Sequence, residues 1–203
     1  KYVEYALDVP MYFIIRNNKY INMTNYTFRN FLENKCTDYK NIEPTIDDWI
    51  NHLSTLFPQV RLKQFLEIRS MDACSWDLIC SQPAFWIGLL YNEKAFDKAQ
   101  ELVESWTQED RNYINKVAPI EGLQAKFKDG TILDVAQKLF EISKQGLDAR
   151  NILARNKSYN ETFYLKDLEN NLASGNSPAD LLINKFNTKW DQDIKKIYSE
   201  NIF

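Results

Sequence analysis

The chain has 203 residues, of which 44% are hydrophobic and 14% aromatic, so it can bury a substantial core and is not a disordered chain. Its net charge of −3 disfavours a general nucleic-acid binder or a membrane-surface binder, because both kinds of anionic partner select basic proteins. No apolar run approaches the roughly 20 residues of a membrane span. We therefore expect neither a nucleic-acid partner nor a membrane.

The first 75 residues are predicted to be rich in strands. The opening 22 residues are typical of a β-hairpin, because MYFIIR and KYIN are built from strand-forming residues and Asn17 and Asn18 between them tolerate the left-handed backbone of a tight turn. Thr27 precedes a short segment with helical spacing, as an N-cap residue does. Thr45 precedes a second one, and Asp48 three residues later completes the pattern of a capping box. Two short helices are expected after the hairpin.

Residues 76–203 are predicted to be helical. The dense apolar segment SWDLICSQPAFWIGLLYN indicates a buried helix broken near Pro83, since proline lacks the N–H of the helical ladder. Residues 122–130 are expected to be a loop. Further stretches have helical spacing: EKAFDKAQELVESWT, QEDRNYINKVAP, TILDVAQKLFEISKQGLDARNILARN, FYLKDLENNLASG and PADLLINKFNTKWDQDIKKIYSEN. Because no linker separates the two regions, the helices are expected to pack on the sheet, with residues 1–203 forming one unit.

The usual catalytic signatures are missing from the sequence, which has no P-loop, no Gly-rich dinucleotide fingerprint, no G-x-S-x-G and no C-x-x-C. The only histidine, His52, lies in a predicted helix and is expected at the surface or at a helix cap. Residues 126–130, KFKDG, could hold an anion, although a polar turn is the favoured interpretation. The odd number of cysteines, three, favours reduced thiols in a cytosol over a disulfide scaffold.

The most unusual stretch is VRLKQFLEIRSMD, residues 60–72, which is predicted to be a strand. Alternate residues of a strand share a face. One face would carry the charged set, which is Arg61, Lys63, Glu67 and Arg69, with Phe65 among them. The other face would contact the core through Leu62, Leu66 and Ile68. The pattern alone favours an ordinary solvent-facing strand; the alternative is a polar cavity floor, where a carboxylate holds Mg²⁺ and arginines clamp carboxylate or phosphate oxygens.

Longer motifs in the sequence favour the second interpretation, the polar cavity floor. YALDVPMYF, TFRNFL, DDWINHLSTLFPQVRLKQFLEIRSMD, QPAFWIGLLY and SPADLLI follow one another in order. Together they closely resemble the carboxy-terminal part of the plant-type glutamate–cysteine ligases of plants and many proteobacteria. The resemblance implies an α+β, glutamine-synthetase-like fold, in which a partial antiparallel sheet is backed by a mostly helical carboxy-terminal region.

The resemblance also implies a reaction. ATP would phosphorylate the γ-carboxylate of L-glutamate, and the amine of L-cysteine would displace phosphate from the acyl phosphate to give γ-glutamylcysteine, the first step of glutathione biosynthesis. Such a transfer needs Mg²⁺ and cations around the phosphates. On the family's E-x-R motif, Glu67 is a Mg²⁺ ligand, and Arg69 binds substrate glutamate or the transferred phosphate. Arg61 is a second catalytic candidate, and Lys63 a second substrate contact.

The cysteine pocket has two candidate residues near the start of the chain. Tyr5 and Met11, both expected on the first strand, would offer a hydroxyl and a soft apolar wall. Family members are much longer than this chain, which opens at Lys1. We therefore expect a carboxy-terminal segment that is inactive alone and is completed by the amino-terminal part of the same ligase, the source of further metal carboxylates and much of the nucleotide site.

Two alternatives remain open at this point. A related glutamate–amine ligase would keep the chemistry and change the amine, and a non-catalytic binding module would keep half the fold without the reaction. A bacterial cytoplasm is expected rather than a plastid.

Overall fold

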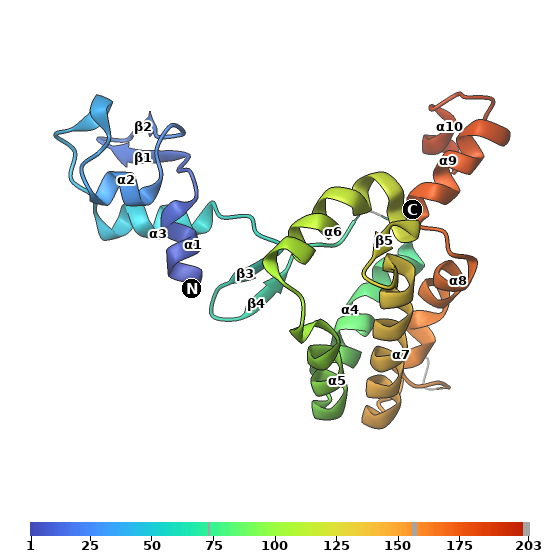
Figure 1. The fold of residues 1–203 in the computed structure, drawn as a ribbon. Coiled ribbons are helices and arrows are strands. Elements are labelled where there is room, and N and C mark those ends of the chain that lie inside the picture. The colour runs from blue at the N-terminus through green and yellow to red at the C-terminus, as the bar shows by residue number, and fades with distance from the viewer. Residues whose placement is uncertain (73, 156–157, 201–203) are drawn as a thin grey trace. The chain divides into compact units, whose positions relative to one another are not determined.

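A computed structural model describes residues 1–72, 74–155 and 158–200. The chain divides into two compact units, Lys1–Asp72 and Ala73–Phe203, where the sequence predicted one (Figure 1). The division lies next to the predicted change from strand-rich to helical sequence. The α+β class is confirmed: in the described residues, helices are combined with three two-stranded antiparallel sheets. None of the helices in the described ranges is long and apolar enough to cross a membrane.

The first unit combines short helices with two hairpins. Its elements are α1 (Tyr2–Asp8), β1 (Phe13–Arg16), β2 (Lys19–Asn22), α2 (Phe28–Leu32), η1 (Thr37–Tyr39), α3 (Ile46–Ser54), β3 (Val60–Leu62) and β4 (Leu66–Ile68). The predicted turn is confirmed, because Asn17 and Asn18 join β1 to β2 with φ of 52° and 58°. Both residues take the left-handed conformation that asparagine tolerates best among the side chains larger than glycine.

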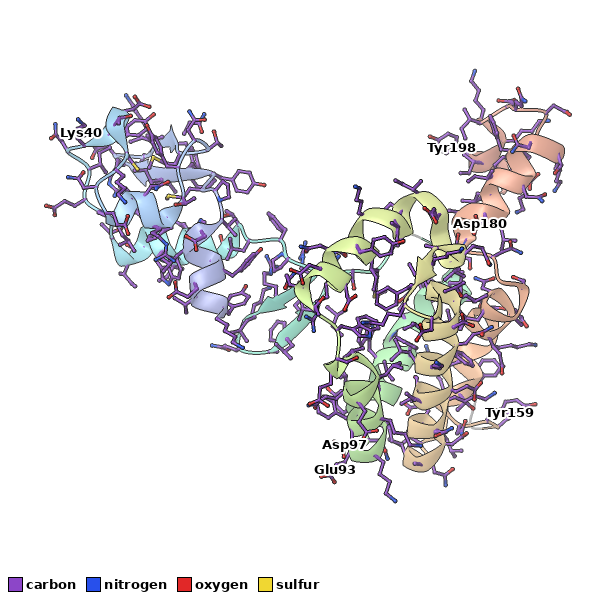
Figure 2. All side chains as sticks on the ribbon, viewed as in Figure 1. Lys40, Glu93, Asp97, Tyr159, Asp180 and Tyr198 are labelled. Carbon is purple, nitrogen blue, oxygen red and sulfur yellow. The ribbon has the colours of Figure 1, made fainter. Side chains whose placement is uncertain are left out.

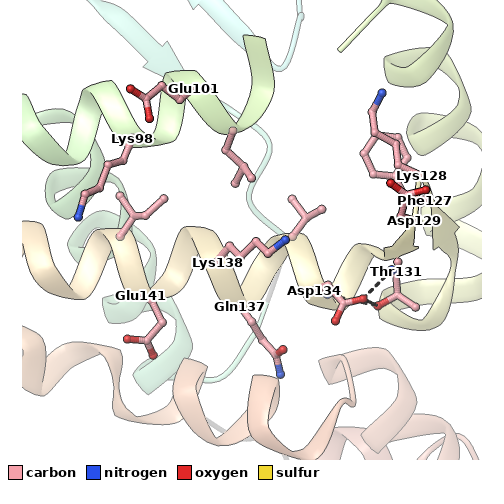
Figure 3. A pocket seen from close by; sticks show the side chains of 14 residues that line it. Lys98, Glu101, Phe127, Lys128, Asp129, Thr131, Asp134, Gln137, Lys138 and Glu141 are labelled. Atoms are coloured by element: carbon pink, nitrogen blue, oxygen red, sulfur yellow. Dashed lines mark hydrogen bonds between the residues drawn. The ribbon is translucent and has the colours of Figure 1, made fainter. Parts of the chain in front are cut away.

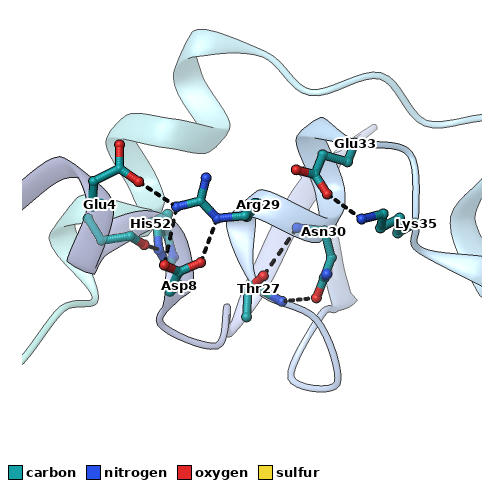
Figure 4. A network of polar contacts seen from close by, with 9 residues as sticks. Glu4, Asp8, Thr27, Arg29, Asn30, Glu33, Lys35 and His52 are labelled. Carbon is teal, nitrogen blue, oxygen red and sulfur yellow. Dashed lines mark hydrogen bonds and ion pairs between the residues drawn. The ribbon is translucent and has the colours of Figure 1, made fainter.

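The prediction that the hairpin begins at residue 1 was wrong, because Tyr2–Asp8 is helix α1. Helical spacing puts Glu4 and Asp8 on one side of α1, where Arg29 of α2 binds both (Figure 4). The Arg29 guanidinium lies 2.6 Å from Asp8 Oδ1 and 2.7 Å from Glu4 Oε2. This contact joins residues more than twenty positions apart, so the local β-forming composition could not reveal it.

Helix α3 is fixed at its amino-terminal end as the sequence predicted. Thr45 caps it, and Thr45 and Asp48 form the reciprocal capping box. Asp48 is buried and also accepts two 2.7 Å hydrogen bonds from the Arg16 guanidinium at the end of β1. The side chains packed beneath these elements form the first core: Met11, Ile14, Met23, Phe28, Phe31 and Cys36.

The prediction that His52 lies at the surface or at a cap was wrong. Its side chain is buried in α3, where its ring stacks on Phe28 and lies beside Trp49. Nε2 lies 2.7 Å from the carbonyl oxygen of Ala6 and therefore donates to it, which leaves Nδ1 unprotonated. Within the described residues, the buried Nδ1 has no hydrogen-bond partner.

We expect this arrangement to make the first unit sensitive to mild acid. Burial lowers the pKa of His52 below its ordinary value. As the pH falls through about 6.5, His52 therefore binds a proton in the unfolded chain and not in the folded unit. Stability is therefore full above about pH 6.5 and falls by up to ~1.4 kcal/mol for each pH unit below it. Amide exchange of α3 should accelerate by up to ~10-fold from pH 6.5 to 5.5, after correction for intrinsic exchange. An unchanged corrected rate would contradict this, and His52→Phe should abolish the effect.

Where the structure describes it, the second unit consists of helices and one small hairpin. Its elements are α4 (Trp76–Leu90), α5 (Glu93–Glu104), α6 (Gln108–Glu121), η2 (Gly122–Gln124), β5 (Lys126–Phe127), β6 (Gly130–Thr131), α7 (Ile132–Arg150), η3 (Glu161–Leu165), α8 (Lys166–Ser174), α9 (Pro178–Thr188) and α10 (Lys196–Glu200). The predicted 122–130 loop thus contains the β5–β6 pair.

Helix α4 runs unbroken through Pro83, where the sequence predicted a break. Packing against α7 and η3 holds the helix together at this point. One of these contacts is the 2.6 Å hydrogen bond that Ser81 donates to the Tyr164 carbonyl.

Helices α4 and α7 lie side by side and form the centre of the second unit (Figure 1). Gly88 on α4 and Gly146 on α7 let the two backbones touch, since a Cβ added at Gly146 would lie 2.0 Å from the Gly88 carbonyl oxygen. Around this contact lies the second core: Ala84, Phe140, Leu147, Leu165 and Leu172. On α5, Glu93 and Asp97 point away from the core (Figure 2).

Candidate functional site

The charged stretch of residues 60–72 forms a hairpin, where the sequence predicted a single strand. Strand β3 pairs antiparallel with β4, and Arg61 lies directly opposite Glu67. The chain reverses at Lys63–Phe65, where the Lys63 amide donates to the Phe65 carbonyl at 2.9 Å. The prediction put these charged residues together because alternate residues of one strand share a face. In the structure, pairing between two strands brings them together instead.

Three cations surround the carboxylate of Glu67. Arg61 Nε lies 2.7 Å from Glu67 Oε2, Lys63 Nζ lies 3.5 Å from the same oxygen, and Arg69 Nη1 lies 3.4 Å from Oε1. The Arg61 hydrogen bond first, and the charges of all three cations with it, hold the pKa of Glu67 below its usual range. The four charged residues predicted to share one space do so, with the Glu67 carboxylate at the centre of the three cations.

Arg61 is the most enclosed of the three cations. The exposed fraction of its side chain is 11%, against 43% for Lys63 and 32% for Arg69. Its Nη1 donates to the carbonyl oxygens of Ser54 at 3.3 Å and Leu56 at 3.2 Å, where α3 ends. Arg61 thus fixes the hairpin to the carboxy-terminal end of α3, whose unpaired carbonyls attract a cation.

Aromatic rings lie beside all three cations. The guanidinium carbons of Arg69 and Arg61 lie 5.1 Å and 5.6 Å from the centre of the Phe57 ring. Lys63 Nζ lies 5.5 Å from the centre of the Phe65 ring. All three distances are in the range of cation–π attraction. Sequence reasoning placed Phe65 in the cluster and missed Phe57, which precedes Pro58 and showed no pattern that would single it out.

The prediction that Leu62, Leu66 and Ile68 contact the core was wrong for the first two. Leu62 and Leu66 are 52% and 66% exposed, and Ile68 is half-buried. The reason is that Arg61 turns the charged face of the hairpin towards α3. Alternation then puts the apolar residues of β3 and β4 on the outside.

Tyr5 and Met11 lie outside the elements predicted for them. Tyr5 is on α1 and is 43% exposed, with its ring against Tyr2. Met11 comes just before β1 and is 1% exposed inside the first core. The structure therefore gives Met11 a packing position, and a role of either residue in a cysteine pocket stays a prediction.

A magnesium site is not complete in the part of the chain that the structure describes. No group of three or more His, Cys, Asp or Glu side chains is placed there to hold a metal. Glu67 is a single carboxylate, and both of its oxygens already receive N–H donors. Since Mg²⁺ prefers several oxygen ligands in octahedral geometry, these residues alone do not fit the ion.

The second unit has an open pocket of about 1020 Å³ between α5, the β5–β6 hairpin and α7 (Figure 3). Its lining mixes lysines with carboxylates, so it carries no dominant charge. Asp134 is already used to cap α7 through Thr131, at 2.7 Å. Of the two lysines in the KFKDG segment, Lys128 pairs with Asp110 at 2.9 Å and Lys126 is exposed, so this segment is a polar turn with one lysine engaged.

Comparison with known proteins gives a consistent answer. The family model described as glutamate-cysteine ligase family 2 (GCS2) matches residues 1–200. The chain is 39% identical over 203 residues to glutamate–cysteine ligase A, chloroplastic, of Oryza sativa subsp. indica, which covers 100% of this chain and 40% of that protein. It is 37% identical to the chloroplastic glutamate–cysteine ligase of Solanum lycopersicum and 38% to that of Arabidopsis thaliana, over 100% of this chain and 38% of each relative.

The chain therefore spans about 40% of the length of these curated relatives. The match extends across both units, and the Glu67 cluster lies inside it. On this evidence the chain belongs to the glutamate–cysteine ligase family 2.

Proposed function

We propose that the chain is part of a ligase that joins L-glutamate to L-cysteine at the expense of ATP. The γ-carboxylate of glutamate takes the γ-phosphoryl group of ATP, and ADP leaves. The cysteine amine then attacks the carbonyl carbon, loses a proton, and phosphate leaves, so that γ-glutamylcysteine forms. The observation that carries the proposal is the cluster of three cations around Glu67, in a chain matched to the family over residues 1–200.

The cluster suits anionic substrates. Glu67 offsets one of its three positive charges, so a net positive charge faces the carboxylate of glutamate or a phosphate. Arg69 is the catalytic candidate, because its guanidinium is partly exposed and its contact to Glu67 is long, at 3.4 Å. Lys63 is a substrate contact on the same grounds. A planar guanidinium can grip two oxygens of a carboxylate or phosphate at once.

Mg²⁺ remains part of the proposal for the complete ligase. Bound Mg²⁺ would neutralise charge on the ATP phosphates. Glu67 would supply one oxygen ligand, and the others would come from the amino-terminal part of the same ligase. The exposed apolar face of the hairpin, formed by Val60, Leu62 and Leu66, is where we expect that part to pack, because an apolar surface of this kind is normally covered.

The names of the relatives favour one amine substrate and one cellular compartment over the alternatives. Each relative cited is named a glutamate–cysteine ligase, which favours cysteine over another amine and a ligase over a non-catalytic module. Each is also named chloroplastic, which favours a plastid over the bacterial cytoplasm expected from the sequence. A glutamine-synthetase-like arrangement of the complete enzyme stays part of the proposal.

The test is product formation by the full-length protein that contains this chain. Phosphate release should require ATP, glutamate, cysteine and Mg²⁺ together, and mass spectrometry should identify γ-glutamylcysteine. Arg69→Ala should lower kcat by roughly 10²–10³-fold, as loss of a group that stabilises transition-state charge does. Arg29→Ala, which removes a guanidinium from the α1–α2 contact in the same unit, is the matched control and should leave kcat unchanged. Product formation with another amine and not with cysteine would refute the proposed substrate.

A further inference from the structure

Arg61 differs from the two cations beside it in what it can reach. Its Nε is committed to Glu67 at 2.7 Å, and its Nη1 to the Ser54 and Leu56 carbonyls at 3.3 Å and 3.2 Å. The residue as a whole is 9% exposed. Lys63 and Arg69 approach Glu67 only at 3.5 Å and 3.4 Å and remain open to solvent. A ligand entering the cluster therefore meets Lys63 and Arg69 before Arg61.

Building on the proposed function, we infer that Arg61 is a positioning residue, which holds the Glu67 carboxylate against the end of α3 and does not itself touch substrate. This changes the role that the sequence predicted for Arg61, which was catalytic. The shortest contact of Glu67 is the one to Arg61, so Arg61 decides where Oε2 lies. Among the described residues, Oε1 is held by the longer Arg69 contact alone, so it is the oxygen left to exchange partners when a ligand arrives.

The anchor behind Arg61 is itself rigid. Helix α3 is fixed at its first turn by the Thr45–Asp48 capping box and by Arg16, and in its last turn by the hydrogen bond of His52 to Ala6. The position of Glu67 is thus tied to the first core through one guanidinium. Only arginine can do this, because its fork of N–H groups reaches a carboxylate and backbone carbonyls together, whereas a lysine ammonium acts as a point charge.

The first experiment separates positioning from substrate contact by steady-state kinetics of the full-length ligase. Arg61→Gln should lower kcat by roughly 10–100-fold, because misplacing a group at the reacting centre slows the chemical step. Its KM for glutamate should stay within about threefold of wild type, because no substrate contact is lost. Arg69→Gln should raise that KM and lower kcat. A KM for glutamate raised tenfold or more by Arg61→Gln, with kcat little changed, would overturn the inference.

The second experiment does not depend on activity. Urea unfolding is measured for Arg61→Gln, Glu67→Ala and the double variant. If Arg61 holds Glu67, the double variant should lose less stability than the two single variants together. Additive losses would overturn the inference. Arg29→Gln with Glu67→Ala is the control pair: these residues share no contact and should be additive. If the wild-type ligase forms no product, the proposed function fails on its own, and this cycle still decides whether Arg61 holds Glu67.

Discussion

Gly146→Ala is expected to destabilise the helical second unit by about 2 kcal/mol or more, although alanine is the better helix former by about 1 kcal/mol. The new methyl group would lie 2.0 Å from the Gly88 carbonyl oxygen and 3.0 Å from Ala95 Cβ. The nearer obstacle is backbone, which cannot rotate away, so α4 and α7 would have to separate. Separation would loosen the packing of Phe140 and Leu147, both buried in this interface. Urea unfolding of the full chain, followed by far-ultraviolet circular dichroism, measures the loss.

The control for this prediction is an exposed position on the same helix. Lys138 on α7 faces solvent, so Lys138→Ala should be more stable than Lys138→Gly by about 1 kcal/mol, through helix propensity alone. If Gly146→Ala were stabilising by a similar amount, the close approach of α4 and α7 would be refuted. In that case helix propensity, and not the close contact with Gly88, would determine the stability of the variant.

Glu67→Gln is expected to lower kcat of the full-length ligase by roughly 10²–10³-fold and to raise the KM for Mg²⁺-ATP. Glutamine has almost the same shape and can still accept the hydrogen bond from Arg61, so the hairpin should stay folded. What is lost is the negative charge that the three cations surround. Phosphate release at varied Mg²⁺-ATP, together with a thermal unfolding curve for each variant, measures both effects.

The matched control for Glu67→Gln is Glu33→Gln. Glu33 pairs with Lys35 at 2.6 Å in the same unit, and this exposed pair lies outside the cluster (Figure 4). Its loss should change stability by less than about 1 kcal/mol and leave kcat as it is. Wild-type turnover by Glu67→Gln would remove Glu67 from the active site.

Much of the local structure could be predicted from the sequence. The turn at Asn17 and Asn18 and the capping box of Thr45 and Asp48 were predicted correctly, because each signal acts over two to four residues. The ordered motifs from YALDVPMYF to SPADLLI identified the family without any structure. The four charged residues of the candidate site were also named from the sequence, although the reason given for their proximity was wrong.

Contacts between distant residues accounted for the failures. Helix α1 is secured by Arg29, and His52 is buried where its ring stacks on Phe28 and its Nε2 bonds to the carbonyl of Ala6, 46 positions earlier in the chain. Helix α4 passes through Pro83 because α7 and η3 support it. In each case, packing outweighs a local preference of about 1–3 kcal/mol.

The sequence by itself determined the family, the caps and turns, and which charged side chains belong to the candidate site. Only the tertiary structure decided that residues 60–68 form a hairpin, that its charged face turns towards α3, and that Arg61 is enclosed while Arg69 stays open. The physical reason is that a period of two specifies which residues share a face and leaves the direction of that face undetermined. Here the carbonyls at the end of α3 determine it, by binding the guanidinium of Arg61.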